Sequence, residues 1–190
     1  MLRSTTFIAP YRCFKKGVVL EFRPGLNLLV GDQGTGKSTI LSLIANNQDN
    51  KETVEIDADE GAFRFFDTEK DNPRHKRYVE TAFDVQCRFK SHGEIMLLIG
   101  EALEQLLAAD NAAPTLFLYD ELESGLSLRS VRKMLYLVET LVARGHQFVV
   151  ATHHPWFIEA APEVLQCYKR ATPKWVSSEK YLKSCRSVRL

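Results

Sequence analysis

The sequence predicts a single α/β domain built around a largely parallel β-sheet. Short apolar runs alternate with stretches of helical periodicity, which is the layout of strands joined by covering helices. The 190 residues suit one domain with a sizeable core, so we expect residues 1–190 to form one unit. An apolar content of 45% and a charged content of 26% are ordinary for a globular protein and exclude a disordered one.

Strand patterns dominate the first part of the chain. Residues 5–9 and 18–22 are short apolar runs that predict strands, and "LNLLV" at 26–30 predicts a buried strand that leads into a glycine-rich turn. Residues 38–46 predict a helix, because their apolar side chains recur on one helical face. The runs "ETVEID" and "AFRFF" predict a further pair of strands, and the polar stretch 67–77 predicts an exposed loop.

The second part of the chain carries clearer patterns. Residues 94–109 have apolar side chains at three- and four-residue spacing, which predicts an amphipathic helix. A second helix is expected to begin after Ser127, a good N-cap residue, and to stop at Gly145. Strands are expected at 115–119 and 147–151, with two short ones within 163–170 and 173–178.

The glycine-rich turn matches the phosphate-binding loop G-x-x-x-x-G-K-[ST]. Its glycines let backbone amides converge on phosphates, while Lys37 supplies a positive charge and Ser38 a hydroxyl for Mg²⁺. The loop also opens a helix, whose N-terminus attracts anions. A glycine turn that precedes a lysine by chance is the weaker alternative, because a buried strand comes before it and a helix after it. The predicted nucleotide-binding residues of this segment are Gly31, Asp32, Gln33, Gly34, Thr35, Gly36, Lys37, Ser38 and Thr39.

Two carboxylates follow the apolar strand "TLFLY". Asp120 stands at the carboxyl edge of the predicted sheet, where it can hold Mg²⁺ through its water shell. Glu121 comes next and is suited to polarising an attacking water molecule. A solvated acidic turn is the alternative, and the phosphate loop makes it the weaker one.

A histidine follows the buried strand "QFVVA". His153 comes straight after "VVAT" and could reach a terminal phosphate as a hydrogen-bond donor or hold a water molecule in line. His153 and His154 could also be structural residues or metal ligands. No Cys or carboxylate lies at ligand spacing nearby, so a metal site is disfavoured.

Taken together, these motifs resemble those of the ATP-binding cassette (ABC) ATPases. The phosphate loop, the Asp120-Glu121 pair, "SGLS" at 124–127 and His153 follow one another as in that family. The resemblance implies a P-loop NTPase fold of ABC type, with a mostly parallel central sheet flanked by helices and an N-terminal antiparallel β portion. It also implies ATP and Mg²⁺ as cofactors, with Glu121 and His153 as catalytic residues.

The family also has a signature segment, usually written LSGGQ, which opens a helix. Here "SHGE" stands in its place, with Ser91, Gly93 and Glu94 as the matching residues and His92 in place of a glycine. A Ser hydroxyl, a Gly amide and a helix N-terminus can together bind an anion, although a polar helix cap is the alternative. The resemblance implies a head-to-tail homodimer, in which each ATP lies between Lys37 of one copy and the signature of the other.

Two elements of the family depart from its usual pattern. Asp67 or Glu69 is the candidate to replace the glutamine that usually contacts Mg²⁺ in this family. The alternative is that these residues belong to a solvated acidic loop. The residue that contacts the adenine could be Tyr11, Arg12 or Phe14. The alternative is that Tyr11 and Phe14 lie at the edge of the core.

The short chain indicates a particular branch of the family. It lacks the larger helical insertion of transporter cassettes and any long heptad pattern, so it is similar to the soluble SMC-like and overcoming-lysogenization-type ATPase heads of DNA repair and phage defence. We therefore expect ATP-driven dimerisation that controls a separate effector. A transporter ATP-binding subunit and a non-hydrolysing assembly module are the alternatives.

The charge balance and the cysteine spacing limit which partners and which compartment we expect. Lys plus Arg is 25 against 24 for Asp plus Glu, so nucleic acid is a possible partner through local basic clusters such as 73–77, which could equally be solvated surface. Four cysteines without paired spacing predict reduced thiols in a cytoplasmic protein. No apolar run is long enough to span a membrane, so no membrane insertion is expected.

Overall fold

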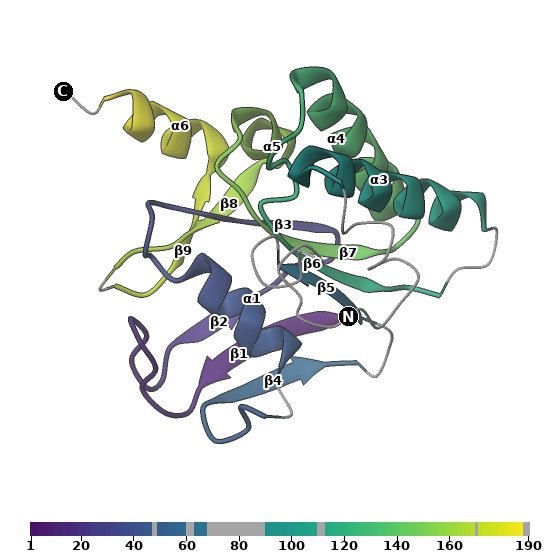
Figure 1. Ribbon diagram of the computed structural model, residues 1–190. Coiled ribbons are helices and arrows are strands. Elements are labelled where there is room, and N and C mark those ends of the chain that lie inside the picture. The colour runs from purple at the N-terminus through teal and green to yellow at the C-terminus, as the bar shows by residue number, and fades with distance from the viewer. Residues whose placement is uncertain (47–48, 60–62, 68–89, 110–112, 170, 188–190) are drawn as a thin grey trace.

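The computed structural model describes residues 1–46, 49–59, 63–67, 90–109, 113–169 and 171–187 (Figure 1). In chain order its elements are β1 (Leu2–Phe7), β2 (Val19–Glu21), β3 (Leu26–Val30), α1 (Lys37–Ala45), β4 (Val54–Ala58), β5 (Phe63–Asp67), α3 (His92–Ala108), β6 (Leu116–Asp120), α4 (Leu128–Ala143), β7 (Gln147–Ala151), α5 (Pro155–Ala160), β8 (Glu163–Gln166), β9 (Lys174–Ser177) and α6 (Ser178–Arg186).

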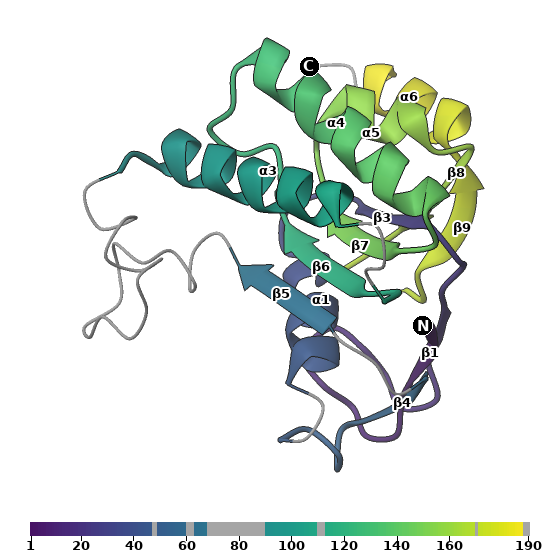
Figure 2. The same ribbon diagram turned by 90° about the vertical axis from the view of Figure 1, so that its right-hand side faces the viewer.

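A six-stranded sheet forms the centre of the molecule. Its strand order is β5-β6-β7-β3-β8-β9, and only β9 runs antiparallel to its neighbour among these strands. Helices α3, α4 and α5 cover one face of the sheet and α1 covers the other, as Figures 1 and 2 show from two sides. The predicted α/β fold with a mostly parallel sheet is confirmed.

Two apolar cores lie on the two faces of this sheet. Successive side chains of a strand point to opposite faces, so a strand covered on both sides needs a continuous apolar run. Strand β6 shows this directly, because Phe117 and Tyr119 pack toward the α3 and α4 side while Leu118 packs toward α1. Phe117 also stacks on Phe148 of β7, with ring centroids 4.6 Å apart.

A smaller antiparallel sheet, with strand order β2-β1-β4, lies beyond α1. It is the N-terminal antiparallel portion that the sequence predicts. The two strands expected at "ETVEID" and "AFRFF" both form, but they belong to different sheets. Strand β4 pairs with β1, and β5 pairs with β6 in the central sheet. The chain therefore crosses from the small sheet to the large one between residues 58 and 63.

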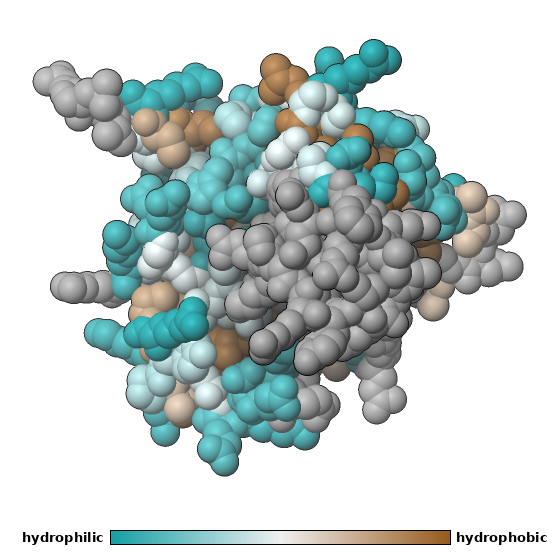
Figure 3. Space-filling view, viewed as in Figure 1, coloured by the Kyte–Doolittle hydropathy of each residue, from teal (hydrophilic) through white to brown (hydrophobic). Residues whose placement is uncertain are grey.

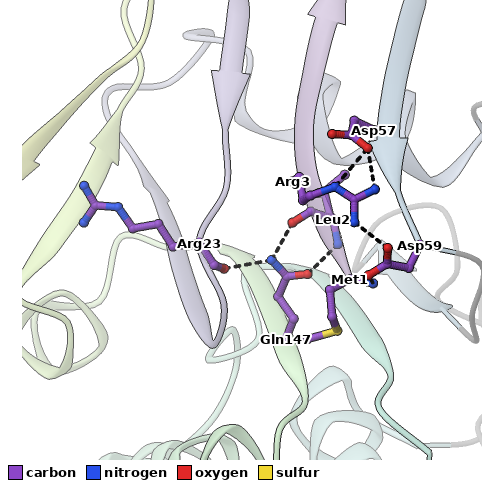
Figure 4. A network of polar contacts seen from close by, with 7 residues as sticks. All are labelled: Met1, Leu2, Arg3, Arg23, Asp57, Asp59 and Gln147. Atoms are coloured by element: carbon purple, nitrogen blue, oxygen red, sulfur yellow. Dashed lines mark hydrogen bonds and ion pairs between the residues drawn. The ribbon is translucent and has the colours of Figure 1, made fainter.

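Gln147 joins the two sheets through its side-chain amide (Figure 4). Its Oε1 accepts a hydrogen bond from the Leu2 amide at 2.8 Å, and its Nε2 donates to the carbonyl oxygens of Leu2 at 2.9 Å and Arg23 at 2.8 Å. The Gln147 residue is fully buried. Its amide therefore satisfies three backbone groups that water could not easily reach.

We expect Gln147→Leu to lower the free energy of unfolding by about 2–5 kcal/mol, because it leaves three backbone polar groups without their partner. Chemical denaturation followed by circular dichroism measures this change. The matched control is Gln105→Leu, which removes the same amide from an exposed position on α3 and should leave stability within about 0.5 kcal/mol of wild type. Equal losses in the two variants would contradict the linking role of Gln147.

His146 gives the fold a pH dependence. The side chain is 2% exposed, and its Nδ1 accepts a hydrogen bond from the Thr115 amide at 3.1 Å. Burial, reinforced by the nearby charge of Arg144, lowers the pKa of His146 below its usual 6.5. The unfolded chain therefore takes up this proton first as the pH falls. The stabilising contribution is complete above pH 6.5 and is lost as the pH falls through the folded-state pKa.

We expect melting temperatures recorded from about pH 8 to pH 5 to fall less steeply for His146→Asn than for wild type. Asn offers an acceptor near the position of Nδ1 but does not titrate. Identical slopes for the two proteins would show that His146 does not contribute to the acid sensitivity.

The described surface is mostly polar. Figure 3 shows hydrophilic residues over most of the described part of one face, with hydrophobic ones in small groups. Among the described helices, none combines the length and the apolar character that crossing a bilayer requires. Among the described residues, Cys13, Cys167 and Cys185 form no disulfide, and Cys87 lies outside the described residues.

Candidate nucleotide-binding site

The phosphate loop connects the end of β3 to the start of α1, and its glycines are required by geometry. Gly36 has φ 94° and Gly31 has φ 135°, values that residues with a side chain rarely adopt. A Cβ on Gly36 would stand 2.7 Å from Cys13 Sγ and from the Phe14 ring. One on Gly31 would stand 2.5 Å from the Cys167 carbonyl oxygen. The loop therefore packs directly against its surroundings.

The α1 N-terminus is suited to an anion. Its N-cap residue, Gly36, makes no side-chain cap hydrogen bond, and the first turn holds no acidic residue. In α3, α4 and α6, by contrast, Ser91, Ser127 and Ser177 accept hydrogen bonds from the first turn. Free N–H groups together with the helix dipole attract phosphate.

Lys37 adds a positive charge at the same point. Its residue is 7% exposed, and its Nζ donates to the carbonyl oxygens of Gly31 at 2.8 Å and Asp32 at 3.1 Å. Burial lowers the pKa of Lys37, although the charges of Asp120 and Glu121 act in the opposite direction. A buried ammonium that is bonded to neutral carbonyls gains from an incoming anion.

The other residues of the predicted loop differ in exposure. Asp32 and Gln33 lie exposed at its tip together with Gly34, and Ser38 is exposed in the first turn of α1. Thr35 is buried, and its hydroxyl donates to the Asp32 carbonyl at 2.8 Å. These positions leave the exposed Ser38 hydroxyl next to the helix N-terminus, where a metal-bound phosphate would need it.

A cavity of about 870 Å³ opens beside the loop. It is lined on one side by residues from 10 to 15, on the other by residues from 34 to 39, and by Lys169. This volume lies within the range of sites for drug-sized ligands and cofactors. A smaller cavity of about 370 Å³ touches the other side of the loop, at Gly31, Asp32 and Thr35.

The candidates for adenine contact occupy different environments in the larger cavity. Arg12 is exposed, has φ 51°, and donates from Nη1 to the Thr39 hydroxyl at 3.1 Å. Its guanidinium also lies 5.6 Å from the centre of the Tyr11 ring. Phe14 is 4% exposed and stacks on Phe7 with centroids 4.5 Å apart, so it is largely a core residue. Arg12 therefore offers the accessible planar group.

The carboxyl ends of the central strands bring the predicted catalytic residues together. Strand β7 lies between β3, which carries the phosphate loop, and β6, which ends at Asp120. Asp67 lies opposite Asp120 in the register of β5 and β6. Both neighbouring strands thus end in an acidic residue. The Asp120 carboxylate and the Ser38 hydroxyl are oxygen groups of the kind that Mg²⁺ prefers as ligands. Glu69, the other candidate, lies outside the described residues.

Glu121 and His153 face the same space. Glu121 has φ 54°, an unusual value for a residue with a side chain, and its amide donates to the Ala151 carbonyl at 2.9 Å. His153 Nε2 lies 4.0 Å from Glu121 Oε1, and both side chains are more than two-fifths exposed. A carboxylate and an imidazole at this separation can act on one water molecule.

Sequence reasoning missed the role of Glu123. Its carboxylate accepts hydrogen bonds from the Thr152 hydroxyl at 2.5 Å and from the His153 amide at 3.2 Å. The only sequence signal is a third acidic residue close to Asp120 and Glu121. His154, by contrast, caps α5 by accepting a hydrogen bond from the Trp156 amide.

The candidate signature segment forms the start of α3. Ser91 is the N-cap residue, and its hydroxyl accepts from the Glu94 amide at 3.3 Å while Glu94 Oε2 accepts from the Ser91 amide at 2.7 Å. These hydrogen bonds to Ser91 hold the pKa of Glu94 below its usual value. The single chain therefore uses "SHGE" as a capping box. A Cβ on Gly93 would lie 2.4 Å from the Gly125 carbonyl oxygen, so the segment contacts the loop 124–127.

Comparisons with known proteins agree with this geometry. Residues 7–102 match the family described as the AAA ATPase domain. The UvrABC system protein A of Chlamydia trachomatis serovar D is 26% identical over 102 residues, which are 50% of this chain and 6% of that protein. The chain thus aligns with a small part of this much longer relative.

Solved ATP-binding cassettes share the fold. A nucleotide-free cassette from an ABC transporter superposes with a TM-score of 0.61 at 14% identity, covering 99% of this chain and 96% of that one. An inward-facing putative metal-chelate type ABC transporter gives 0.59 at 19% identity, with 94% and 84% covered. A dimeric cassette in a post-hydrolysis state, bound to ADP and Pi, gives 0.57 at 17% identity, with 93% and 97% covered. Such identities show a common fold, that of ABC-type P-loop ATPases.

Proposed function

The chain belongs to the AAA ATPase domain family, and we propose that it binds ATP with Mg²⁺ and hydrolyses it at the edge of the central sheet. The observation that carries this proposal is the buried Lys37 ammonium. In the described part of the chain its Nζ donates to the Gly31 and Asp32 carbonyls of its own loop, beside a helix N-terminus with no side-chain cap. This arrangement fits an anionic ligand, because a buried ammonium beside a helix N-terminus gains from an incoming anion.

Each residue of the proposed site has a distinct task. The loop amides and Lys37 bind the phosphates, and Arg12 lies where it can contact the base. Ser38 and Asp120 would hold Mg²⁺, with Asp67 as a further candidate. The metal, when bound, neutralises charge on the phosphates. Glu121 accepts a proton from the attacking water, and His153 holds that water or the terminal phosphate in place.

The proposed active form is a head-to-tail homodimer that ATP joins. Ser91, Gly93 and Glu94 of one copy would complete the site of the other by presenting the α3 N-terminus to the terminal phosphate. The dimeric cassette bound to ADP and Pi shows that the same fold can form a dimer.

We further propose that the chain acts as a cytoplasmic ATPase head of the SMC-like or overcoming-lysogenization type. ATP-driven dimerisation would then control a separate effector in DNA repair or phage defence, with nucleic acid as a possible partner. The match to part of a UvrABC system protein supports this proposal over a transporter subunit. A transporter ATP-binding subunit is the second candidate, because several solved relatives come from ABC transporters. Co-purification with membrane proteins would favour the second candidate.

Mixing two inactive variants tests the shared site. Ser91→Ala and Lys37→Ala should each have little ATPase activity alone, because every site in either homodimer lacks one half. A mixture should recover activity, since one site of each mixed dimer has an intact Lys37 and an intact Ser91. Steady-state phosphate release at varied mixing ratios measures this recovery. Activity that stays at the level of the separate variants at every ratio would reject the shared site.

A further inference from the structure

The Glu123 carboxylate joins two loops at the proposed catalytic edge. Glu123 lies in the loop after β6, two residues beyond Glu121. Its Oε1 accepts from the Thr152 hydroxyl at 2.5 Å and from the His153 amide at 3.2 Å. Thr152 and His153 follow directly after β7. One oxygen atom therefore links the loop that carries Glu121 to the loop that carries His153.

The Thr152 hydroxyl makes two hydrogen bonds. It donates to Glu123 and accepts from the His154 amide at 3.0 Å. The Thr152 residue is completely buried, and its own amide donates to the Leu29 carbonyl of β3 at 3.1 Å. A short hydroxyl-to-carboxylate hydrogen bond is among the stronger ones in proteins. Thr152 thus holds Glu123 against a rigid part of the sheet.

The second carboxylate oxygen argues against a purely stabilising role. Glu123 Oε2 is buried, and none of the described residues gives it a hydrogen bond. A buried acceptor without a donor destabilises the folded state. Such groups are uncommon in native structures, and a catalytic role is one of the reasons for which they are retained. A side chain that accepted the Thr152 hydrogen bond without burying a second, unpaired oxygen would avoid this penalty, so stability alone does not explain a glutamate there.

We propose that Glu123 and Thr152 are positioning residues that hold His153 beside Glu121 during hydrolysis, an inference that rests on the proposed ATPase activity. Glu123 fixes the His153 backbone amide, and the His153 imidazole in turn lies 4.0 Å from the Glu121 carboxylate. Neither residue lines the cavity beside the phosphate loop. Breaking the contact between them therefore impairs turnover and leaves ATP binding intact.

Two independent variants break this contact. Thr152→Val keeps the side-chain volume but removes the hydroxyl, and Glu123→Ala removes the acceptor. Each is expected to lower kcat by roughly 10–100-fold, because small displacements of a catalytic group have effects of this size. The dissociation constant for ATP should stay within about twofold of wild type, since the phosphate loop is untouched. Thr152→Ser retains the hydroxyl and should recover most of the wild-type kcat.

The controls separate positioning from loss of structure. Glu139→Ala removes a carboxylate from an exposed position on α4 and should leave kcat unchanged. Melting curves of all variants show whether each one folds. In a His153→Ala background, followed under single-turnover conditions, Glu123→Ala and Thr152→Val should reduce the rate little further, because they act through His153.

Three outcomes are distinguishable. Losses that appear only in the presence of His153 support the inference. A wild-type kcat in Thr152→Val, or losses that multiply in the His153→Ala background, would overturn it while the ATPase proposal stands. If the wild-type protein binds ATP but does not hydrolyse it, the proposed function fails and the positioning role fails with it.

Discussion

Lys37→Ala is expected to weaken ATP binding by on the order of 100-fold or more. The buried ammonium supplies charge-assisted hydrogen bonds to phosphate in a site where solvent screening is weak. In the free protein it bonds to the Gly31 and Asp32 carbonyls, so the substitution also removes the contacts that shape the empty loop. Titration calorimetry with ATP and Mg²⁺ measures the change in affinity.

The matched control for Lys37 is Lys51→Ala, which removes the same charge from an exposed turn. It should bind ATP as wild type does. Melting curves show whether Lys37→Ala still folds, which we expect because a neutral methyl group replaces a partly desolvated charge. If a folded Lys37→Ala protein binds ATP with wild-type affinity, the phosphates do not bind at this loop.

Glu121→Gln should preserve ATP binding and lower turnover by about 10²–10⁴-fold, the usual contribution of a general base. The amide has nearly the shape of the carboxylate but cannot accept a proton from water. The left-handed backbone at Glu121 and its hydrogen bond to Ala151 are independent of the side chain, so the loop geometry should persist. Single-turnover hydrolysis of radiolabelled ATP separates the chemical step from product release.

Glu139→Gln is the control for this experiment, because it makes the same change at an exposed position on α4. Its turnover should match that of wild type. Normal turnover in Glu121→Gln would mean that another residue acts as the base, and Glu123, two residues further along the same loop, would be the next carboxylate to test.

The elements nearest the site were the easiest to predict from sequence. The strands at 26–30 and 147–151 have the predicted bounds, because a strand buried on both faces is predominantly apolar. The phosphate loop was recognisable because its glycines have left-handed backbones or contact neighbouring groups closely. Such local requirements determine the residue types at these positions, so the sequence alone reveals them.

Strand pairing was harder, because it depends on distant partners. The runs "ETVEID" and "AFRFF" look like one hairpin, since only a short connection separates them. In the structure β4 pairs with β1 and β5 with β6. Each strand pairs with a partner that is distant in sequence, and neither pairing is visible in the local sequence.

Two helices were missed for different reasons. Helix α5 has only six residues, too few for a periodic pattern, although Pro155 and the capping His154 mark its start. Helix α6 follows β9 without a loop and buries little apart from Tyr181, so few apolar side chains mark it in the sequence. The hydrogen bond from Thr152 to Glu123 spans 29 positions, and only the fold brings the two together.

The most direct test of the shared ATP site is the molar mass of Glu121→Gln in solution. Light scattering should give the mass of one chain, 21.6 kDa, without nucleotide, and twice that mass with saturating ATP and Mg²⁺. The slow turnover of this variant keeps ATP in place during the measurement. A protein that is saturated with ATP and still has the mass of a single chain would contradict the account.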